Sequence, residues 1–319
     1  MIRSLLISLS RASWAQNAIS NWLFARKAAQ RFVAGEQSTD AVRAVKQLNQ
    51  QRFLATIDHL GENTTTLDEA MRATQAITSL LEEIQKTGIK ANVSLKLSQI
   101  GLVVSKDICI ENLTVILERA RACHNFIRID MEDSSLTDRT LEVYHQLHYA
   151  GFTNLGVVIQ AYLYRSEADI RKIMGEGGKI RLCKGAYKEA LTVAYPVKKD
   201  VDANYDRLVE LILDNIKSSQ LVDESSNGYI PPSLAVATHD LHRIIHCKAF
   251  AERVGLPKQA YEFQMLYGIR RELQAQLAAD GYSVRVYVPY GTHWYSYFMR
   301  RLAERPANLK FFITSYFRR

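Results

Sequence analysis

Eight short runs of apolar and β-branched residues, separated by longer stretches with helical spacing, constrain the fold more than any other feature. The runs lie at 52–58, 92–98, 126–132, 154–160, 179–185, 233–239, 260–266 and 284–290. Strands that alternate with helices predict parallel pairing, and eight such units within about 260 residues predict a closed (β/α)8 barrel. We therefore expect one α/β barrel domain over 51–319, preceded by an N-terminal helical arm over 1–50.

Local signals mark several connections between these elements. Thr66 with Glu69, and Ser166 with Asp169, have the spacing of a capping box, in which side chains satisfy the first free amides of a helix. The polar segment 218–233 predicts a surface loop before the sixth strand.

The charge balance narrows the range of ligands. Lysine and arginine number 41 against 33 aspartate and glutamate residues, which gives a net charge of +8. Such an excess suits nucleic acid, an anionic membrane surface or an anionic small molecule. Because no basic tract is interleaved with aromatic residues, we expect no nucleic-acid partner. The sequence also lacks an apolar run of about 18 residues, so it predicts no membrane span.

The four cysteines are scattered and form no CxxC pair. We interpret Cys109, Cys123, Cys183 and Cys247 as reduced thiols of an intracellular protein. The histidines in 239–246 form a helix-start cluster rather than a metal-ligand pattern, so no metal site is expected.

The N-terminal segment is basic and amphipathic, with no acidic residue before Glu36. This pattern is typical of an organellar transit peptide or of a helix lying on a membrane surface. The alternative is an ordinary helix packed on the domain, and we favour this alternative or the surface role over a cleaved signal. The expected location is cytoplasmic, with peripheral contact to the inner face of the cytoplasmic membrane as an option.

Every predicted strand ends in at least one polar or charged residue. Active sites of such barrels form at the C-terminal strand ends, and burying these groups unpaired would cost about 2 kcal/mol or more each. The strand-end groups are Asp58, Lys96, Asp130, Glu132, Gln160, Lys184, Thr238, His239, Gln264 and Tyr287. They predict one wide, mostly cationic mouth, with the cations Lys96, Arg181, Lys184, Arg300 and Arg301 and the acids Asp130, Glu132 and Glu304.

The stretch 284–305 holds a dense group of candidate residues. Thr292 is predicted to be the N-cap of a helix after the eighth strand. The spacing i, i+3, i+4 and i+7 then places on one helical face Tyr297, Arg300, Arg301 and Glu304. For an isolated arginine pair, the alternative is a solvated basic surface.

Lys96 and the segment 181–189 each allow more than one role. Lys96 could pair with Asp130 for structural reasons, form a Schiff base as in class I aldolases on this fold, or position a substrate. The sequence RLCKGAYKE at 181–189 is either a tight turn or a close approach to a phosphate or ring. A flavin dinucleotide with a small carboxylic acid substrate fits the polar, tyrosine-lined mouth.

The sequence resembles the flavin-dependent proline dehydrogenases over roughly residues 50–310. The resemblance is carried by LKLSQIG, IRIDMED, VVIQAY, RLCKGAYKE, ATHD, YEFQMLYGIR and VYVPYGTHWYSYFMRRLAERPAN, in the order of the family. The segment WYSYFMRRLAERP is similar to the corresponding segment of the monofunctional bacterial branch. The resemblance implies a distorted (β/α)8 TIM-like barrel that holds FAD non-covalently at the strand exits.

The resemblance also implies an activity and its partners. L-Proline would be oxidised to Δ1-pyrroline-5-carboxylate by hydride transfer from proline C5 to FAD N5, the first step of proline catabolism. A quinone would reoxidise the flavin, and a separate pyrroline-5-carboxylate dehydrogenase would be the metabolic neighbour.

The matching motifs carry over the family's site residues. The implied catalytic set is Lys96, Asp130, Tyr287, Tyr297, Arg300 and Arg301. Lys96 and the two arginines would bind the proline carboxylate, and the pyrrolidine ring would contact Tyr287, Tyr297, Leu266 and Ala186. Flavin-contacting positions match Asp130, Gln160, Arg181, Lys184, Gly185, Ala186, Tyr187, Thr238, His239, Gln264 and Glu304. The segments 195–205 and 309–319 depart from the common pattern.

Three alternatives stay open at this point. Hydroxyproline oxidation on the same fold is disfavoured because Tyr297 matches a tyrosine that occupies the space of a ring hydroxyl in proline-specific members. A flavin-free aldolase would use Lys96 as its nucleophile. A membrane-surface or scaffold protein built on an inactive barrel would not need the intact Lys96, Asp130 and arginine pair.

Overall fold

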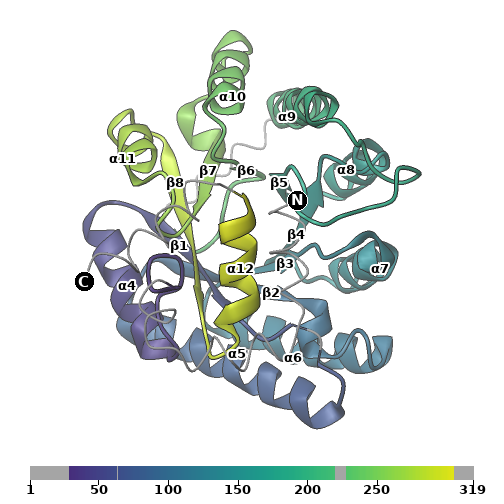
Figure 1. The fold of residues 1–319 in the computed structure, drawn as a ribbon, viewed down its shortest axis with the longest axis vertical. Helices are drawn as coiled ribbons and strands as arrows, with labels where there is room; N and C mark the ends of the chain where they lie inside the picture. Colours follow the sequence, from purple (N-terminus) through teal and green to yellow (C-terminus); the bar gives the residue numbers. More distant parts are fainter. Residues whose placement is uncertain (1–28, 63, 220–227, 305–319) are drawn as a thin grey trace.

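Eight parallel strands close into a barrel in sequence order (Figure 1). The computed structural model describes residues 29–62, 64–219 and 228–304. The strands are β1 (Leu54–His59), β2 (Ala91–Lys96), β3 (Ile127–Asp130), β4 (Leu155–Gln160), β5 (Lys179–Cys183), β6 (Leu234–Ala237), β7 (Tyr261–Leu266) and β8 (Ser283–Tyr290). The predicted barrel class is confirmed, and every predicted strand agrees to within two residues at either end.

Helices surround the barrel on its outside, except for the last one. They are α4 (Ser38–Gln50), α5 (Leu67–Thr87), α6 (Lys106–Ala122), α7 (Ser134–Tyr149), α8 (Ser166–Gly175), α9 (Lys198–Ser219), α10 (Leu241–Arg253), α11 (Arg271–Ala279) and α12 (Trp294–Glu304). Two short 3₁₀ helices, η1 (Leu97–Ile100) and η2 (Lys258–Ala260), complete the described elements. Figure 1 shows α12 across the centre of the ring. Tyr297, Arg300 and Arg301 of this helix line one pocket together with strand-end residues.

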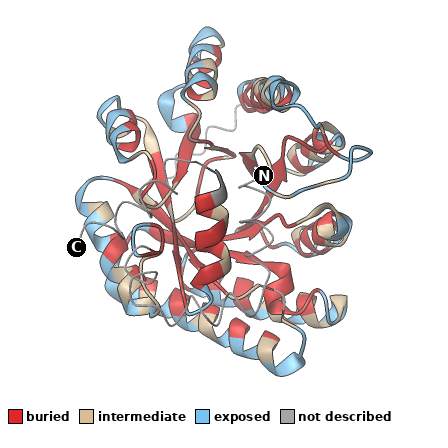
Figure 2. Cartoon of the chain, viewed as in Figure 1, coloured by how far each residue is buried: buried red, intermediate tan, exposed pale blue. Residues whose placement is uncertain are grey.

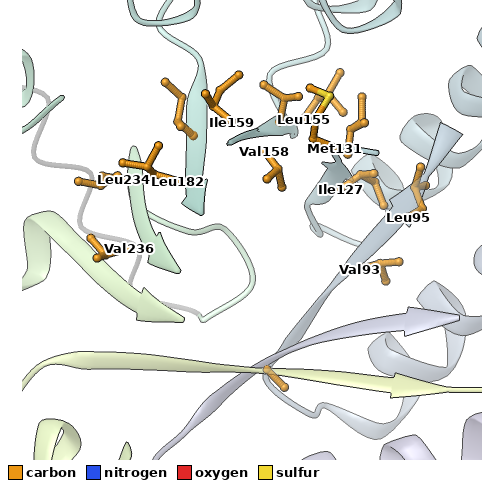
Figure 3. Close-up of a cluster of buried hydrophobic side chains, with 14 of the residues drawn as sticks. Val93, Leu95, Ile127, Met131, Leu155, Val158, Ile159, Leu182, Leu234 and Val236 are labelled. Carbon is orange, nitrogen blue, oxygen red and sulfur yellow. The ribbon is translucent and has the colours of Figure 1, made fainter. Parts of the chain in front are cut away.

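The apolar core lies between the strands and the helices. Alternate strand residues such as Val93, Leu95 and Leu182 point outward and are fully buried against the helical layer (Figure 3). The outer faces of the helices are exposed, whereas the strands and inner helix faces are buried (Figure 2). The two-residue period of a strand therefore leaves the alternate positions facing the barrel interior.

The barrel interior is polar rather than filled with branched apolar side chains. Arg285 of β8 and Glu262 of β7 are both fully buried and pair at 2.9 Å. Arg128 of β3 is also buried and donates to the Val157 carbonyl at 3.3 Å. Gly156 makes room for it, because a Cβ atom there would lie 2.5 Å from Arg128 Nη1.

Helix starts agree only in part with the sequence signals. Thr66 caps α5, and the reciprocal bonds with Glu69 form the predicted capping box. The predicted box at Ser166 is wrong, because Arg165 is the N-cap of α8 and Ser166 is its first helical residue. The buried Ser166 hydroxyl instead donates to the Gln160 carbonyl at 2.8 Å, which ties α8 to the end of β4. The final helix begins at Trp294, two residues beyond Thr292.

The segment that precedes the barrel packs on β1 and β8. Helix α4 buries Ala41, Ala44 and Val45, and the Ala34 amide donates to the Pro289 carbonyl at 2.9 Å. The N-terminal segment 1–36, expected to be a helix on a membrane surface or packed on the domain, lies outside the described residues up to position 28, and so does the tail 309–319. Across the part that is described, the helices lack the combined length and apolar character that a bilayer span requires.

Replacement of Glu262 by alanine is expected to destabilise the protein strongly. The change leaves the Arg285 guanidinium buried without its carboxylate, a loss of about 3–5 kcal/mol in the free energy of unfolding. Glu82→Ala is the matched control, since Glu82 is half-exposed and faces Arg119 at 3.3 Å, and it should cost less than about 1 kcal/mol. Urea unfolding measures both, and equal losses would contradict the prediction.

Candidate active site

A pocket of about 460 Å³ opens at the C-terminal ends of the strands, beneath α12. The predicted site residues on its lining are Lys96, Asp130, Gln160, Arg181, Lys184, Gly185, Ala186, Tyr187, Thr238, His239, Gln264, Leu266, Tyr287, Tyr297, Arg300 and Arg301. The side chain of Glu304 lies outside the described residues. The lining also includes Met131, Val158, Cys183, Ala237, Asp240 and Met265, which the sequence did not single out.

The register of the strands places these residues at the same level along the barrel axis. Lys96 is the direct neighbour of Asp130 across β2 and β3, and Leu266 is the neighbour of Tyr287 across β7 and β8. Because all eight strands run parallel, their final inward-facing residues meet at a single end of the barrel.

Lys96 stands at the centre of a buried charge network. Its amine lies 3.2 Å from Asp58, 3.4 Å from Glu62 and 3.9 Å from Asp130. Burial alone would lower the pKa of Lys96, but these carboxylates outweigh burial and raise the pKa well above its usual value. Lys96 therefore stays protonated at neutral pH and cannot act as a Schiff-base nucleophile, which requires the neutral amine. This geometry disfavours the aldolase alternative.

Arg181 and Tyr287 complete the network at the pocket floor. Arg181 Nη1 donates to Asp130 Oδ1 at 2.6 Å, and Nη2 donates to the Ser94 hydroxyl at 3.0 Å. The Tyr287 hydroxyl lies 2.6 Å from Asp58 Oδ2 and 2.7 Å from Asp130 Oδ2. Burial and the two carboxylates raise the pKa of Tyr287 well above its usual value, so the phenol stays neutral.

Helix α12 closes the pocket from above. Arg300 holds Glu62 with two bonds, from Nη2 to Oε1 at 2.8 Å and from Nη1 to Oε2 at 3.3 Å. The Arg301 guanidinium lies over the Tyr297 ring, 5.0 Å from its centroid. The outer side of α12 is held by a second apolar cluster. In this cluster Trp294 and Phe298 of α12 pack with Phe32, which precedes the barrel.

The side of the pocket formed by the segments after β5 and β6, here called the far half, is also built from paired groups. The Lys184 amine binds Asp202 of α9 and, at 2.7 Å, Asp240 at the start of α10. His239 Nε2 accepts the Leu266 amide at 3.0 Å, so this nitrogen carries no proton.

The cationic mouth predicted from the sequence is therefore largely balanced by acids. Asp58 was recognised only as a strand-end group, and Glu62, Asp202 and Asp240 were missed because they lie in loops or in a neighbouring helix. A usable signal for Glu62 was its position four residues after Asp58, directly beyond the first strand. Glu132, expected among the acids of the mouth, instead accepts the Ser98 amide at 3.1 Å and its hydroxyl at 2.6 Å.

A closed parallel barrel with a polar pocket at its strand exits has the arrangement in which the active sites of (β/α)8 enzymes are found. Comparison with known proteins assigns the family. The family model described as proline dehydrogenase matches residues 41–313, so the chain belongs to the proline dehydrogenase family and is an oxidoreductase.

The relatives include monofunctional bacterial proline dehydrogenases that match over most of both chains. Proline dehydrogenase 1 of Bacillus subtilis is 44% identical over 90% of this chain and 89% of its own. Proline dehydrogenase 2 of the same species is 37% identical over 97% and 96% of the two chains. The Deinococcus radiodurans proline dehydrogenase is 42% identical over 89% and 88%.

A longer relative shares the fold. The crystal structure of proline utilization A (PutA) from Bdellovibrio bacteriovorus, inactivated by N-propargylglycine, matches with a TM-score of 0.78 and 28% identity. The match covers 88% of this chain and 33% of that one, so this chain spans about a third of the PutA length.

The stability of the folded protein should depend on Glu62 in acid. Burial opposes ionisation of Glu62, but Lys96 and Arg300 outweigh it and lower its pKa to about 2. The ionised carboxylate thus stabilises the fold above the unfolded pKa of about 4.3, and this contribution is lost as the pH falls towards about 2. Urea unfolding between these limits should show a weaker pH dependence for Glu62→Gln, whereas parallel curves would contradict it.

Proposed function

We propose that this chain oxidises L-proline to Δ1-pyrroline-5-carboxylate in the pocket beneath α12, with FAD as the bound two-electron acceptor. The proposal is carried by the contact between Arg300 and Glu62. Two N–H groups of this guanidinium already hold a carboxylate beside the protonated Lys96. Paired, charge-assisted bonds of this kind fix a carboxylate in position and orientation, which is what an amino acid substrate needs.

The proline carboxylate would take the place of Glu62 at Arg300, with Arg301 and Lys96 as its further cations. Glu62 belongs to the loop after β1 rather than to a strand, so it can give way without disturbing the barrel. The pyrrolidine ring would then lie among apolar and aromatic groups of the lining: Ala186, Leu266, Tyr287 and Tyr297.

Unpartnered polar atoms on the pocket lining support the proposal of a bound flavin. Gln160 and Gln264 are buried on its lining, and their Oε1 atoms have no hydrogen-bond partner among the described residues. The Nε atom of Arg181 likewise has no hydrogen-bond partner among the described residues. Buried polar atoms without partners are costly, and a ring with several N–H and carbonyl groups would satisfy them.

The residues proposed to hold FAD comprise ten on the pocket lining: Asp130, Gln160, Arg181, Lys184, Gly185, Ala186, Tyr187, Thr238, His239 and Gln264. Glu304 of α12 is proposed with them. When bound, FAD supplies the acceptor for the hydride that leaves proline C5. Arg181 offers a fixed positive charge on the floor, where it would favour a negatively charged reduced ring. Its own position is fixed by Asp130 and Ser94.

The substrate amine must be neutral when the hydride leaves, because its lone pair forms the new C=N bond. The carboxylates nearest the pocket floor are already bound to Lys96, Arg181 or Tyr287. We therefore infer that the ammonium proton leaves before binding or passes to water.

Electron transfer out of the enzyme is proposed to go to a quinone, with membrane contact through the N-terminal arm. The product would pass to a separate pyrroline-5-carboxylate dehydrogenase, and the proposed location is the cytoplasm or the inner face of the cytoplasmic membrane. Hydroxyproline is disfavoured as a substrate because Tyr297 is buried where α12 meets the pocket.

The experiment that tests this function is proline-dependent reduction of a dye acceptor, with hydroxyproline alongside. Purified protein is expected to be yellow, and its visible absorbance should bleach when proline is added without air. The dye should be reduced at least about tenfold faster with proline than with hydroxyproline, since an unaccommodated hydroxyl costs about 1.4 kcal/mol or more. A colourless protein, or equal rates, would contradict the proposal.

Arg300→Met should raise the KM for proline steeply and leave the bound FAD nearly unchanged. Losing charge-assisted hydrogen bonds worth about 1.5–3 kcal/mol corresponds to an increase in KM of roughly 10- to 100-fold. Arg171→Met is the matched control, because Arg171 is exposed on α8 and pairs only with Glu167 among the contacts described. Steady-state kinetics and flavin content measure the two effects, and an equal loss of both would show that Arg300 does not act on the substrate.

A further inference from the structure

Asp58 is buried behind the pocket and does not line it. It lies in β1 with 1% of its surface exposed, and its Oδ2 atom faces Lys96 of β2 at 3.2 Å. The same atom lies 2.6 Å from the hydroxyl of Tyr287 on β8. Its Oδ1 atom has no hydrogen-bond partner within the described ranges.

The Tyr287 hydroxyl has more close acceptors than it has protons. Its oxygen lies 2.6 Å from Asp58 Oδ2 and 2.7 Å from Asp130 Oδ2. A phenol donates one hydrogen bond, and both distances are typical of O–H···O bonds. If both carboxyl groups were ionised, the Tyr287 hydroxyl could donate to only one of them. At the other contact, a carboxylate oxygen and the phenol oxygen would face each other with no proton between them. A second proton on one of the two carboxyl groups relieves this contact.

The surrounding charges place this proton on Asp58. Asp130 has a guanidinium partner, because Arg181 Nη1 donates to Asp130 Oδ1 at 2.6 Å. The amine of Lys96 is shared by Asp58, Glu62 and Asp130. Burial raises the pKa of Asp58, and although Lys96 opposes this, the neighbouring charges of Asp130 and Glu62 add to the rise.

The proton also changes the charge available to a substrate. Lys96, Arg181 and Arg300 face Glu62 and Asp130, so a neutral Asp58 leaves one positive charge in excess among these groups. An ionised Asp58 would cancel that excess. The carboxylate of an incoming amino acid is therefore attracted more strongly by these groups while Asp58 holds its proton.

We propose that Asp58 is a positioning residue that carries a proton in the resting enzyme and, through the Tyr287 hydroxyl, fixes the pocket floor for an anionic substrate. The proton on Asp58 Oδ2 is donated to Tyr287, and the Tyr287 proton is donated to Asp130. When Asp58 loses its proton, two carboxylates compete for the single hydroxyl proton of Tyr287. This competition displaces the Tyr287 ring. The proposal rests on the proposed function for the identity of the substrate.

The kinetic test compares Asp58→Asn with Asp58→Ala in the holoenzyme. An asparagine N–H can donate to Tyr287 as the protonated acid does, whereas alanine cannot. Asp58→Ala is expected to raise the KM for proline by about tenfold or more, the loss of one buried hydrogen bond, and Asp58→Asn should restore most of that affinity. The parent KM should rise with increasing pH as Asp58 ionises, and this rise should be absent in Asp58→Asn.

Two results would overturn the proposal. The first is an asparagine variant no better than alanine, and the second is the same rise of KM with pH in the parent and in Asp58→Asn. Asp130→Asn is the matched comparison, because it removes a carboxylate that Arg181 needs as an ion and should show no rescue.

Infrared spectroscopy of the parent enzyme tests the proton without any substrate. A carboxylic acid C=O band that shifts in deuterated water is expected, and Asp58→Asn should lack it. The absence of this band from the parent would refute the proposal even if both variants failed to fold. If proline were not oxidised at all, the proposed function would fail while this band could still be present, so the two failures are distinguishable.

Discussion

The protonated amine of Lys96 is the charge around which the strand exits are organised. A buried ammonium is costly without partners, and its partners come from the strands on either side and from the loop after β1. Asp130 is the register neighbour of Lys96, and Asp58 and Glu62 lie within 3.4 Å of its amine. Each acid is in turn held by another group, so Arg181, Tyr287 and Arg300 are drawn into the same network.

This network is possible because the barrel separates its polar and apolar residues by strand face. Outward positions such as Leu95 and Val286 are fully buried against helices and supply the core. Inward positions carry charge at two levels, with Arg285 and Glu262 paired deep in the barrel and Lys96 at the exits. The helical layer can therefore stabilise the fold while the interior is reserved for binding. Helix α12 completes the enclosure by bringing Arg300 and Tyr297 over the opening.

Much of the fold and of the pocket lining could be predicted from the sequence. The period of two in runs such as 284–290 is local, so strand positions were predicted accurately, and barrel closure then brought the strand-end residues together. The predicted capping box at Ser166 was wrong because the serine hydroxyl bonds the end of β4, a contact distant from the local pattern. Glu62 was missed because no periodicity marks a loop residue whose partner, Arg300, is 238 positions away.

The sequence by itself determined the eight strand–helix units, the inward and outward faces of each strand, and the motifs that mark the proline dehydrogenase family. These features depend on residues close together in the chain. Only the tertiary structure decided which charges face one another, as in the contact of Tyr287 with both Asp58 and Asp130. Charge pairing and protonation depend on distances and burial that closing of the barrel creates, and no local pattern contains them.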